Sequence, residues 1–380
     1  MTVSSSQDFL RALGARSIPG AGGRAYVAYR NRADVRWLLP ADPILRGVGL
    51  QLYTPQRLRG RLLKRAIATG ALRGERVWLD GTTLRELELT LGRCVGQIEP
   101  SLAFSLGTEG ATQKATAQLI GNDGTVLGYA KIAIGPLANE ALDAEWRNLQ
   151  RAAVAAPRGQ VPEPIHVGTW RDAGILLMTP GPALPGPTNL GQAHFDFLSA
   201  VHHSTREERE FGSSRMFARL SGAIAQWGHV WPDPWPRRFA RALVRLEAEL
   251  GAVRVPLSFA HRDFAPWNTR WGPAGLYVLD WEMARDGLIP LYDAFHFDAI
   301  RAATRNVRLR SEIGYLERLL ARLWPDGVDR LRALYLAYLL DVSLLYGEAR
   351  ARAPEAGDER VWSWFGRVID QYLAASCQCL

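Results

Sequence analysis

Two acids and one amide stand close together in the last third of the chain, at a spacing that could support phosphoryl transfer. Four residues separate Asp263 from Asn268, and Asp280 follows after a short segment with two glycines. Mg²⁺ prefers oxygen ligands, which an amide at Asn268 and a carboxylate at Asp280 supply. Asp263 would stay ionised and free of metal, so that it can orient an acceptor hydroxyl and take its proton. The spacing therefore predicts a magnesium-dependent transfer site.

Short apolar segments must position these side chains. Residues 255–260 form an apolar run that leads into the loop of Asp263. The alternating pattern of residues 276–279 predicts a buried strand, and Asp280 lies at its end. The sequence Gly-Pro-Ala-Gly at 272–275 supplies the turn of a hairpin between the two acids. We therefore expect one acid in a loop and the other on a rigid strand end.

These residues resemble a known family. The segment His261-Arg262-Asp263-Phe264-Ala265-Pro266-Trp267-Asn268 and the pair Asp280-Trp281 are similar to the His-x-Asp-x-x-x-x-Asn loop and the Asp-Trp or Asp-Phe pair of the aminoglycoside phosphotransferase and choline kinase superfamily. The resemblance covers roughly residues 100 to 350. It implies an α+β, two-lobed protein-kinase-like fold, with a small antiparallel-sheet N-lobe and a larger helical C-lobe. It also implies that Asp263 is the catalytic base and that Asn268 and Asp280 bind metal.

The resemblance extends to supporting residues, with two departures. Pro290-Leu291-Tyr292-Asp293 is similar to the family's Asp-Pro-x-x-Asp segment, which implies that Asp293 braces the catalytic loop by hydrogen bonds to its backbone. His261 has a supporting place in the same loop. Arg262 stands where the small-molecule kinases usually have glycine, and the acid usual before the brace is missing at Pro290. Arginine at this position resembles the protein-kinase loop more than that of the small-molecule kinases, so the class of acceptor stays open.

A nucleotide-binding lobe should precede the catalytic loop, with a lysine on one of its strands. Residues 126–134 predict that strand, after a turn at 121–124, and Lys131 lies within it. The 46 basic residues include only three lysines, at 64, 114 and 131. A lysine in a chain that otherwise uses arginine indicates a position where an ammonium group is needed. A compact ammonium can approach phosphates where a forked guanidinium is too large. The alternative is an ordinary lysine of an edge strand.

The partner of Lys131 should be a glutamate on the next helix. Residues 137–153 have helical periodicity and contain several acids. We favour Glu145, which lies four residues before Leu149 in the family's Glu-x-x-x-Leu pattern. Glu140 is the second choice, because the helix dipole alone explains an acid in the first turn.

Three further residues are candidates for nucleotide contact. Gly107 and Gly110 lie in a short polar segment whose backbone N–H groups could cover the phosphates of a nucleotide. The same pattern is also typical of a plain hairpin turn. Met178 ends an apolar strand that runs into a Pro/Gly-rich hinge, where the backbone would hydrogen-bond adenine. A core position explains Met178 equally well.

The rest of the C-terminal chain has a helical pattern, which predicts an α-rich lobe. The expected helices cover residues 192–204, 239–250, 292–303, 313–323 and 328–346. His194, His202 and His203 fit no zinc signature, and we interpret them as packing or capping residues.

The first hundred residues concentrate positive charge. Residues 1–80 contain 14 Arg and Lys against 5 Asp and Glu, and the whole chain carries a formal charge of +8. Residues 57–67 could form a basic amphipathic helix that rests on anionic lipid, or a solvated face packed on the N-lobe. The pattern does not favour nucleic acid as a partner, since no recognised RNA- or DNA-binding signature accompanies the charge. We expect a basic extension at 1–98, a nucleotide-binding lobe at 99–182 and a catalytic lobe at 183–380.

Other features of the sequence indicate where in the cell the protein is expected. The N-terminus lacks the basic start and apolar stretch of a signal peptide, and no apolar run reaches the length of a membrane span. Cys94, Cys377 and Cys379 are too few for a disulfide framework. We therefore expect a cytoplasmic protein, with peripheral membrane contact through the basic region as an added hypothesis.

Together these features predict a Mg-ATP-dependent kinase that moves the γ-phosphate of ATP to a hydroxyl of a small molecule. The segments 264–267 and 295–297 resemble family members associated with bacterial surface-polysaccharide assembly, which favours a sugar or glycolipid acceptor. One alternative is a catalytically silent, nucleotide-binding regulator or scaffold of the same fold. Another is a protein Ser/Thr kinase, although Trp281-Glu282 stands where Phe-Gly would follow Asp280.

Overall fold

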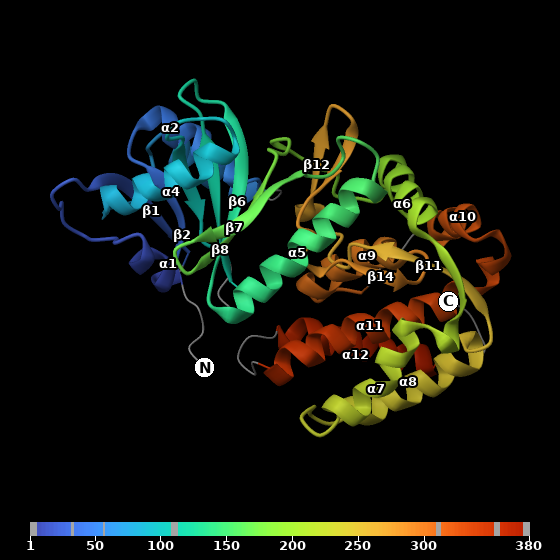
Figure 1. The fold of residues 1–380 in the computed structure, drawn as a ribbon. Coiled ribbons are helices and arrows are strands. Elements are labelled where there is room, and N and C mark those ends of the chain that lie inside the picture. Colours follow the sequence, from blue (N-terminus) through green and yellow to red (C-terminus); the bar gives the residue numbers. More distant parts are fainter. Residues whose placement is uncertain are drawn as a thin grey trace. The chain divides into compact units, whose positions relative to one another are not determined.

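The chain forms two compact units (Figure 1). The computed structural model describes residues 6–31, 34–55, 58–107, 113–308, 313–352 and 358–374. The first unit, called the sheet unit below, comprises Met1–Val154, Arg158–Gly186 and Thr269–Glu282. The second, the helical unit, comprises Ala155–Pro157, Pro187–Asn268 and Met283–Leu380. The expected domain limits at residues 98 and 182 stay predictions.

An antiparallel sheet of eight strands is the centre of the sheet unit, in the order β3-β1-β2-β4-β5-β6-β8-β7. The strands are β1 (Arg24–Asn31), β2 (Asp34–Pro40), β3 (Glu75–Leu79), β4 (Ser101–Ser105), β5 (Lys114–Ile120), β6 (Val126–Ile134), β7 (Pro164–Trp170) and β8 (Ala173–Met178). The predicted hairpin turn at 121–124 joins β5 to β6, with Gly124 at a φ of +82°.

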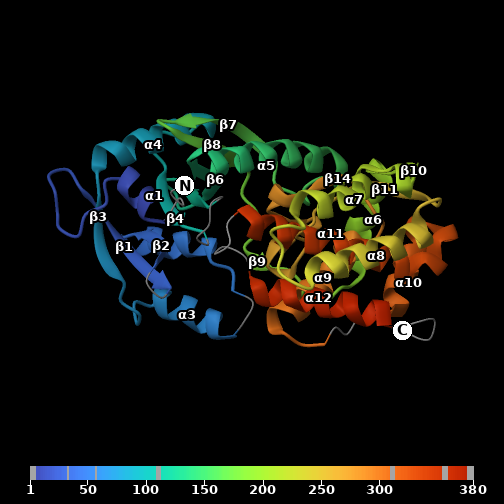
Figure 2. The same ribbon diagram turned by 90° about the horizontal axis from the view of Figure 1, so that it is seen from below.

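Helices cover both faces of this sheet, because successive residues of its strands are apolar on opposite sides. The helices are α1 (Ser6–Ala12), α2 (Pro43–Gly49), α3 (Leu58–Ala68), α4 (Gly81–Cys94) and α5 (Pro136–Ala155). On one face Leu84 and Leu87 of α4 belong to the same core cluster as Phe104 of β4. On the other face Ile67 of α3 belongs to the core cluster of Ala103, the residue before Phe104. Figure 2 shows α4 and α3 on either side of the strands.

The first hundred residues supply part of this sheet. Strand β2 pairs with β4, with Trp37 opposite Ser105 and Leu38 opposite Phe104. Leu38 has no exposed surface and lies in the same core cluster as Phe104. The segment expected as an extension therefore contributes three strands and several helices to the layers of the sheet unit.

Helix α5 agrees with the prediction for residues 137–153 and begins at Pro136, a residue favoured in the first turn of a helix. Leu142 is buried. Asn139 Oδ1 accepts a hydrogen bond of 3.1 Å from the backbone N–H of Gly174, which ties the helix to β8. The acids of α5 are thereby held at a fixed place along the sheet.

A small second sheet completes the sheet unit, in the order β13-β12-β9. Its strands are β9 (Leu184–Pro185), β12 (Thr269–Gly272) and β13 (Gly275–Val278). Gly272 pairs with Gly275 across the hairpin, as the turn at 272–275 predicts. Gly275 has a φ of +104°, which requires glycine.

The helical unit consists of seven helices and a three-stranded sheet within the described residues, and the mixture with the sheet unit confirms the α+β class (Figure 1). The helices are α6 (Gln192–Thr205), α7 (Arg215–Trp227), α8 (Trp235–Leu250), α9 (Tyr292–Arg305), α10 (Ile313–Leu323), α11 (Leu331–Arg352) and α12 (Glu359–Ala374). The strands, in the order β10-β11-β14, are β10 (Glu207–Glu210), β11 (Arg254–Ala260) and β14 (Arg285–Leu288). The structure adds α7 and α12 to the helices expected from the sequence.

Helix α11 is the buried centre of the helical unit. It contacts α7, α8, α9 and α12, and Leu334, Tyr338 and Leu340 have no exposed surface. A helix that is apolar on most sides is buried on most sides. Asp341, also 0 % exposed, is an exception that needs partners. No described helix is long and apolar enough to cross a membrane.

Candidate active site

In the sheet unit, Lys131 lies within β6 and has two carboxylate partners. Its Nζ pairs with Glu145 of α5 and lies 2.6 Å from Oδ1 of Asp280. Strand β6 is hydrogen-bonded to β5 on one side and to β8 on the other, so the alternative of an edge-strand lysine is wrong. The Glu145 side chain is 2 % exposed, whereas Glu140 is exposed to solvent. The geometry thus selects Glu145 as the partner of Lys131.

A second lysine, Lys114 at the start of β5, joins the same cluster. Its Nζ lies 3.0 Å from Glu145 Oε2 and 2.5 Å from Glu282 Oε2. Glu145 therefore receives one ammonium on each carboxylate oxygen, Lys131 on Oε1 and Lys114 on Oε2. Two of the three lysines of the chain are used here. The third, Lys64, donates to a backbone carbonyl of its own region.

The electrostatics of the cluster favour a charged Lys131 and a further cation. Burial lowers the pKa of Lys131, but the carboxylates of Asp280 and Glu145 raise it more, so the net shift of the pKa is upward. Burial raises the pKa of Glu282, and the neighbouring charge of Asp280 raises it further. Two ammonium groups face three carboxylates, and the ionised cluster carries one negative charge in excess.

The donor atoms of this cluster suit a magnesium ion. Glu145, Asp280 and Glu282 each offer a carboxylate oxygen, and these oxygens all lie within 4.8 Å of one another. Mg²⁺ is a hard cation that binds one or two carboxylates together with nucleotide phosphates. Glu145 is occupied by both lysines, so Asp280 and Glu282 are the residues of the sheet unit that fit the metal.

Asp280 is held in an unusual backbone conformation two residues after the end of β13. Its φ is +72°, in the left-handed region that costs a non-glycine residue about 1–3 kcal/mol. Arg262 (φ +66°) and Leu291 (φ +65°) share this conformation. Strained residues persist only where their surroundings hold them, and they are frequent at functional sites. All three flank or belong to the motifs singled out from the sequence.

In the helical unit, Asp263 and Asn268 close the loop that follows β11. Asn268 Nδ2 donates to Asp263 Oδ2 at 2.8 Å and to the backbone oxygen of Asp263 at 2.9 Å. The Asn268 residue is 4 % exposed, whereas 35 % of the Asp263 side chain is exposed. His296 Nε2 of α9 lies 3.4 Å from the other oxygen of Asp263. The loop therefore presents one positioned, solvent-accessible carboxylate.

Asp293 braces this loop from the first turn of α9. Its Oδ2 accepts a hydrogen bond of 2.8 Å from the N–H of His261, and its Oδ1 accepts one of 2.9 Å from the N–H of Arg262. Burial raises the pKa of Asp293, and the neighbouring His261 side chain and the two N–H donors partly oppose this shift. His261 Nδ1 in turn accepts a hydrogen bond of 3.2 Å from the N–H of Asp263. Both residues occupy the supporting positions that the resemblance implies.

The expected nucleotide-contact residues have mixed outcomes. Gly107 follows β4 at a φ of +61°, and a Cβ there would lie 2.7 Å from the backbone oxygen of Lys114, so only glycine fits. Gly110 lies outside the described residues. Met178 ends β8 and is 7 % exposed, which is typical of a core residue. Contact of Gly107 or Met178 with a nucleotide stays a prediction.

Sequence reasoning missed several residues of these two clusters. Lys114 and Glu282 lie in the lysine cluster, and the rarity of lysine could have identified Lys114. His296 lies beside Asp263, and its place between Phe295 and Phe297 gave no sign of that contact. The three histidines 194, 202 and 203 lie on α6, and no group of described metal-ligating residues includes them.

An eight-stranded antiparallel sheet with a buried lysine–glutamate pair, together with a helical unit that carries a braced Asp–Asn loop, defines the chain as a phosphotransferase with a kinase-like fold. Residues 130–334, more than half of the chain, match the phosphotransferase enzyme family APH, and the chain belongs to this family. A search of curated proteins gave no match.

Solved structures confirm the fold. One is a thermostable mutant of aminoglycoside phosphotransferase APH(4)-Ia in a ternary complex with ADP and hygromycin B, with a TM-score of 0.53 and 14% identity over 77% of this chain and 100% of that chain. Another is the choline kinase LicA from Streptococcus pneumoniae, with a TM-score of 0.51 and 14% identity over 71% of this chain and 92% of that chain. At this identity the likeness shows the kinase-like fold.

Proposed function

We propose that the protein is a Mg-ATP-dependent phosphotransferase that moves the γ-phosphate of ATP to a hydroxyl of a small molecule. Lys131, held by Glu145, aligns the phosphates of ATP. Asp263 is the catalytic base, and Asn268 and Asp280 bind metal, with Glu282 as a further carboxylate. A bound Mg²⁺ would neutralise charge on the phosphates.

The observation that carries this proposal is the shared use of Glu145 by two lysines. Two buried ammonium groups are costly to desolvate, and a purely structural role is served as well by apolar side chains. Lys114 and Lys131 are retained in a chain that otherwise uses arginine. Side chains of 8 % and 15 % exposure that end in compact cations suit phosphate groups, since an ammonium acts as a point charge.

Calorimetric titration of ATP with and without Mg²⁺ tests the proposal. We expect magnesium-dependent binding to the intact protein, and its loss in Asp280→Ala because a metal-binding carboxylate is removed. Asp263→Ala should keep ATP binding and lower turnover by at least about 10² once an acceptor is found, as expected for a positioned base. The matched control is Asp326→Ala, an exposed acid of the helical unit.

A titration in which ATP does not bind the intact protein would contradict the proposal. It would favour the alternative of a catalytically silent scaffold. Binding without turnover on any hydroxyl acceptor would favour a nucleotide-binding regulator. Incubation with labelled ATP and cell extract separates the remaining alternative, because a protein Ser/Thr kinase would place the label in protein.

For the acceptor we propose a sugar or glycolipid, in line with the resemblance to members associated with surface-polysaccharide assembly. The solved neighbours bind hygromycin B in one case and are a choline kinase in the other, so small polar molecules with hydroxyls suit this fold. A screen of sugars, glycolipids, aminoglycosides and choline with an ATP-consumption assay would rank the acceptors. Turnover with choline or an aminoglycoside alone would contradict a sugar acceptor.

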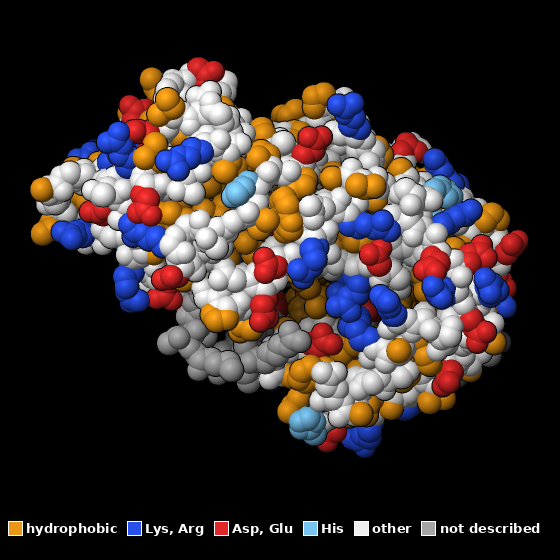
Figure 3. All heavy atoms as spheres, viewed as in Figure 1, with side chains coloured by type: hydrophobic (Ala, Val, Ile, Leu, Met, Phe, Trp, Pro, Cys, Tyr) orange, Lys and Arg blue, Asp and Glu red, His pale blue; other side chains and the backbone are white. Residues whose placement is uncertain are grey.

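We further propose that a cytoplasmic pool of the protein contacts anionic membrane through the basic N-terminal region at 1–98, whose charge is concentrated in the sequence segment 43–74. This segment contains seven Arg and Lys and no acid, while the other 39 basic residues of the chain are nearly balanced by its 38 acids. On the face drawn in Figure 3, acidic and basic side chains are interspersed. The exposed row of α3 consists of Leu58, Arg61, Leu62 and Arg65, which is the composition of an interfacial helix.

Sedimentation with vesicles tests this contact. We expect binding to vesicles with phosphatidylglycerol, weaker binding to pure phosphatidylcholine, and loss of binding in the double variant Arg61→Gln/Arg65→Gln, because each cation near an anionic surface contributes about 1 kcal/mol. Arg237→Gln, exposed on α8, is the matched control. Equal sedimentation of the double variant and the intact protein would contradict a role for α3.

A further inference from the structure

The catalytic loop carries an arginine at a position that its backbone does not favour. Arg262 has a φ of +66°, which glycine adopts without strain and arginine does not. The brace from Asp293 holds the backbone N–H groups of His261 and Arg262, so it would serve equally well with glycine at 262. The arginine side chain must therefore contribute something that offsets the strain.

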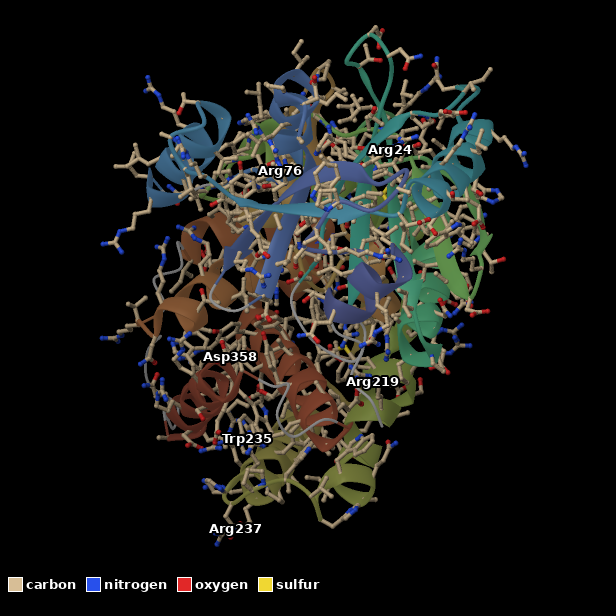
Figure 4. All side chains as sticks on the ribbon, turned by 90° about the vertical axis from the view of Figure 1, so that its left-hand side faces the viewer. Arg24, Arg76, Arg219, Trp235, Arg237 and Asp358 are labelled. Atoms are coloured by element: carbon tan, nitrogen blue, oxygen red, sulfur yellow. The ribbon has the colours of Figure 1, made fainter. Side chains whose placement is uncertain are left out.

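The Arg262 side chain is buried and leads to α11. Its Nη2 donates to Asp341 Oδ2 at 2.9 Å, and the two side chains are 3 % and 0 % exposed. Tyr292, the residue before the Asp293 brace, donates its hydroxyl to the same Asp341 oxygen at 2.7 Å. The second oxygen of Asp341 pairs with Arg219 of α7, which Figure 4 labels beside the helices of the same unit.

This network joins the catalytic loop to the centre of the helical unit. Asp341 is a fully buried charged residue of α11, and its neighbours Leu340 and Val342 have no exposed surface either. Its carboxylate contacts three elements: the loop at Arg262, the start of α9 at Tyr292, and α7 at Arg219. A buried ion pair adds little net stability compared with apolar packing, so its value lies in the geometry it fixes.

We propose that Asp341 is a positioning residue, which acts through Arg262 to hold the loop of Asp263 in its reactive geometry. Asp293 fixes the backbone at residues 261 and 262, and Asp341 fixes the side chain of Arg262, so the residue before Asp263 is held at both ends. The role in turnover rests on the proposed function. The anchoring itself does not.

Four proteins test the proposal: the intact chain, Asp341→Asn, Arg262→Gly and the double variant. We expect Asp341→Asn to lower kcat by about 10²-fold, the effect of a base displaced by about 1 Å, while the KM for ATP changes less than about twofold. The double variant should be no slower than the slower single variant, because Asp341 acts through Arg262. Full kcat in a folded Asp341→Asn, or effects of the two substitutions that multiply, would overturn the proposal.

Amide hydrogen exchange supplies a readout that needs no turnover. Exchange should speed up in the peptide 261–268 of Asp341→Asn and stay unchanged in Asp370→Asn, which breaks the Arg238 pair of 2.7 Å between α8 and α12. Two results for Asp341→Asn would overturn the anchor: faster exchange throughout the helical unit, or an unchanged exchange rate in the peptide 261–268. If Asp341→Asn does not fold, Arg262→Gly decides, since the same loop exchange and loss of kcat are expected of it.

The two readouts also separate this inference from the proposed function. An intact protein that turns over no acceptor counts against the proposed function, and the loop exchange still decides whether Asp341 anchors Arg262. Normal turnover with unchanged loop exchange in both single variants would overturn the anchor alone.

Discussion

The carboxylate of Glu145 holds two lysines at once, one from β5 and one from β6. A helix residue that faces two neighbouring strands can do this only where the helix is fixed along the sheet, as α5 is through Asn139 and Gly174. Both ammonium groups depend on it for neutralisation, because Asp280 and Glu282 are more exposed. At the scale of single residues, Glu145 is the member of the cluster whose loss should matter most.

Glu145→Gln keeps the volume of the side chain and removes its charge. We expect the free energy of unfolding to fall by about 3 kcal/mol, because two buried ammonium groups lose a partner, and the KM for ATP to rise as Lys131 loses its fixed position. Urea unfolding and steady-state kinetics measure the two effects. Glu140→Gln, exposed on the same helix, should change stability by less than about 0.5 kcal/mol. Equal effects of the two substitutions would contradict the assignment.

At the scale of elements, α6 packs against β11, the strand that leads into the catalytic loop. His202 Nδ1 of α6 lies 3.0 Å from the Ser258 hydroxyl of β11, and His194 lies against the ring of Phe264 in the loop. Both histidines are almost fully buried, and burial lowers the pKa of each to about 4. They are therefore neutral in the folded protein at neutral pH.

This burial predicts an acid-sensitive contact between α6 and β11. In the unfolded chain each histidine takes up a proton near its ordinary pKa of 6.5, whereas in the folded chain it does so only near a pKa of about 4. The unfolded state thus binds more protons in this window, and stability falls as the pH drops from about 6.5 towards 4, by up to about 3 kcal/mol per histidine. Urea unfolding across this range measures the effect.

The control for this pH dependence is a histidine on the surface. His202→Gln should flatten the dependence of stability on pH, and His166→Gln, exposed on β7, should leave it as steep as in the intact protein. A profile that stays equally steep in both variants would show that other groups cause the acid sensitivity.

At the scale of the whole molecule, the sheet extends further than the lobe expected from the sequence. Strands β1, β2 and β3 precede residue 98 and continue the sheet beyond β4, and their core residues mix with those of the later strands. Removal of residues 1–98 would expose the edge of β4 and the buried side chains of Leu102 and Phe104. Unpaired apolar edges promote aggregation.

A chain truncated to begin at residue 99 should therefore be insoluble or unfolded, as measured by expression, sedimentation and circular dichroism. The point variant Leu38→Ala, at a position with no exposed surface, should lower the free energy of unfolding by about 2–5 kcal/mol. Ile44→Ala, at an apolar residue that is 76% exposed, is the matched control with little effect. A stable, folded truncated chain would support an independent extension at 1–98.

The sequence by itself determined the features that depend on local pattern. Periodicity predicts α5, α10 and β6 nearly to the residue. The Gly-Pro-Ala-Gly segment at 272–275 predicts the hairpin before Asp280, because neighbours along the chain decide helix and turn formation. The loop of Asp263 and the lysine of β6 could be singled out for the same reason. Lysine is rare in this chain, and Asp263, Asn268 and Asp280 stand at an unusual spacing.

Only the tertiary structure decided which distant residues meet. Lys114 and Glu282 are 168 positions apart, and Arg262 and Asp341 are 79 apart, yet each pair forms an ion contact. No pattern along the chain encodes such contacts, because they arise where the sheet and helices pack and leave buried charges that need partners. The same holds for the first three strands, whose place in the sheet depends on pairing with β4 and on the shared core.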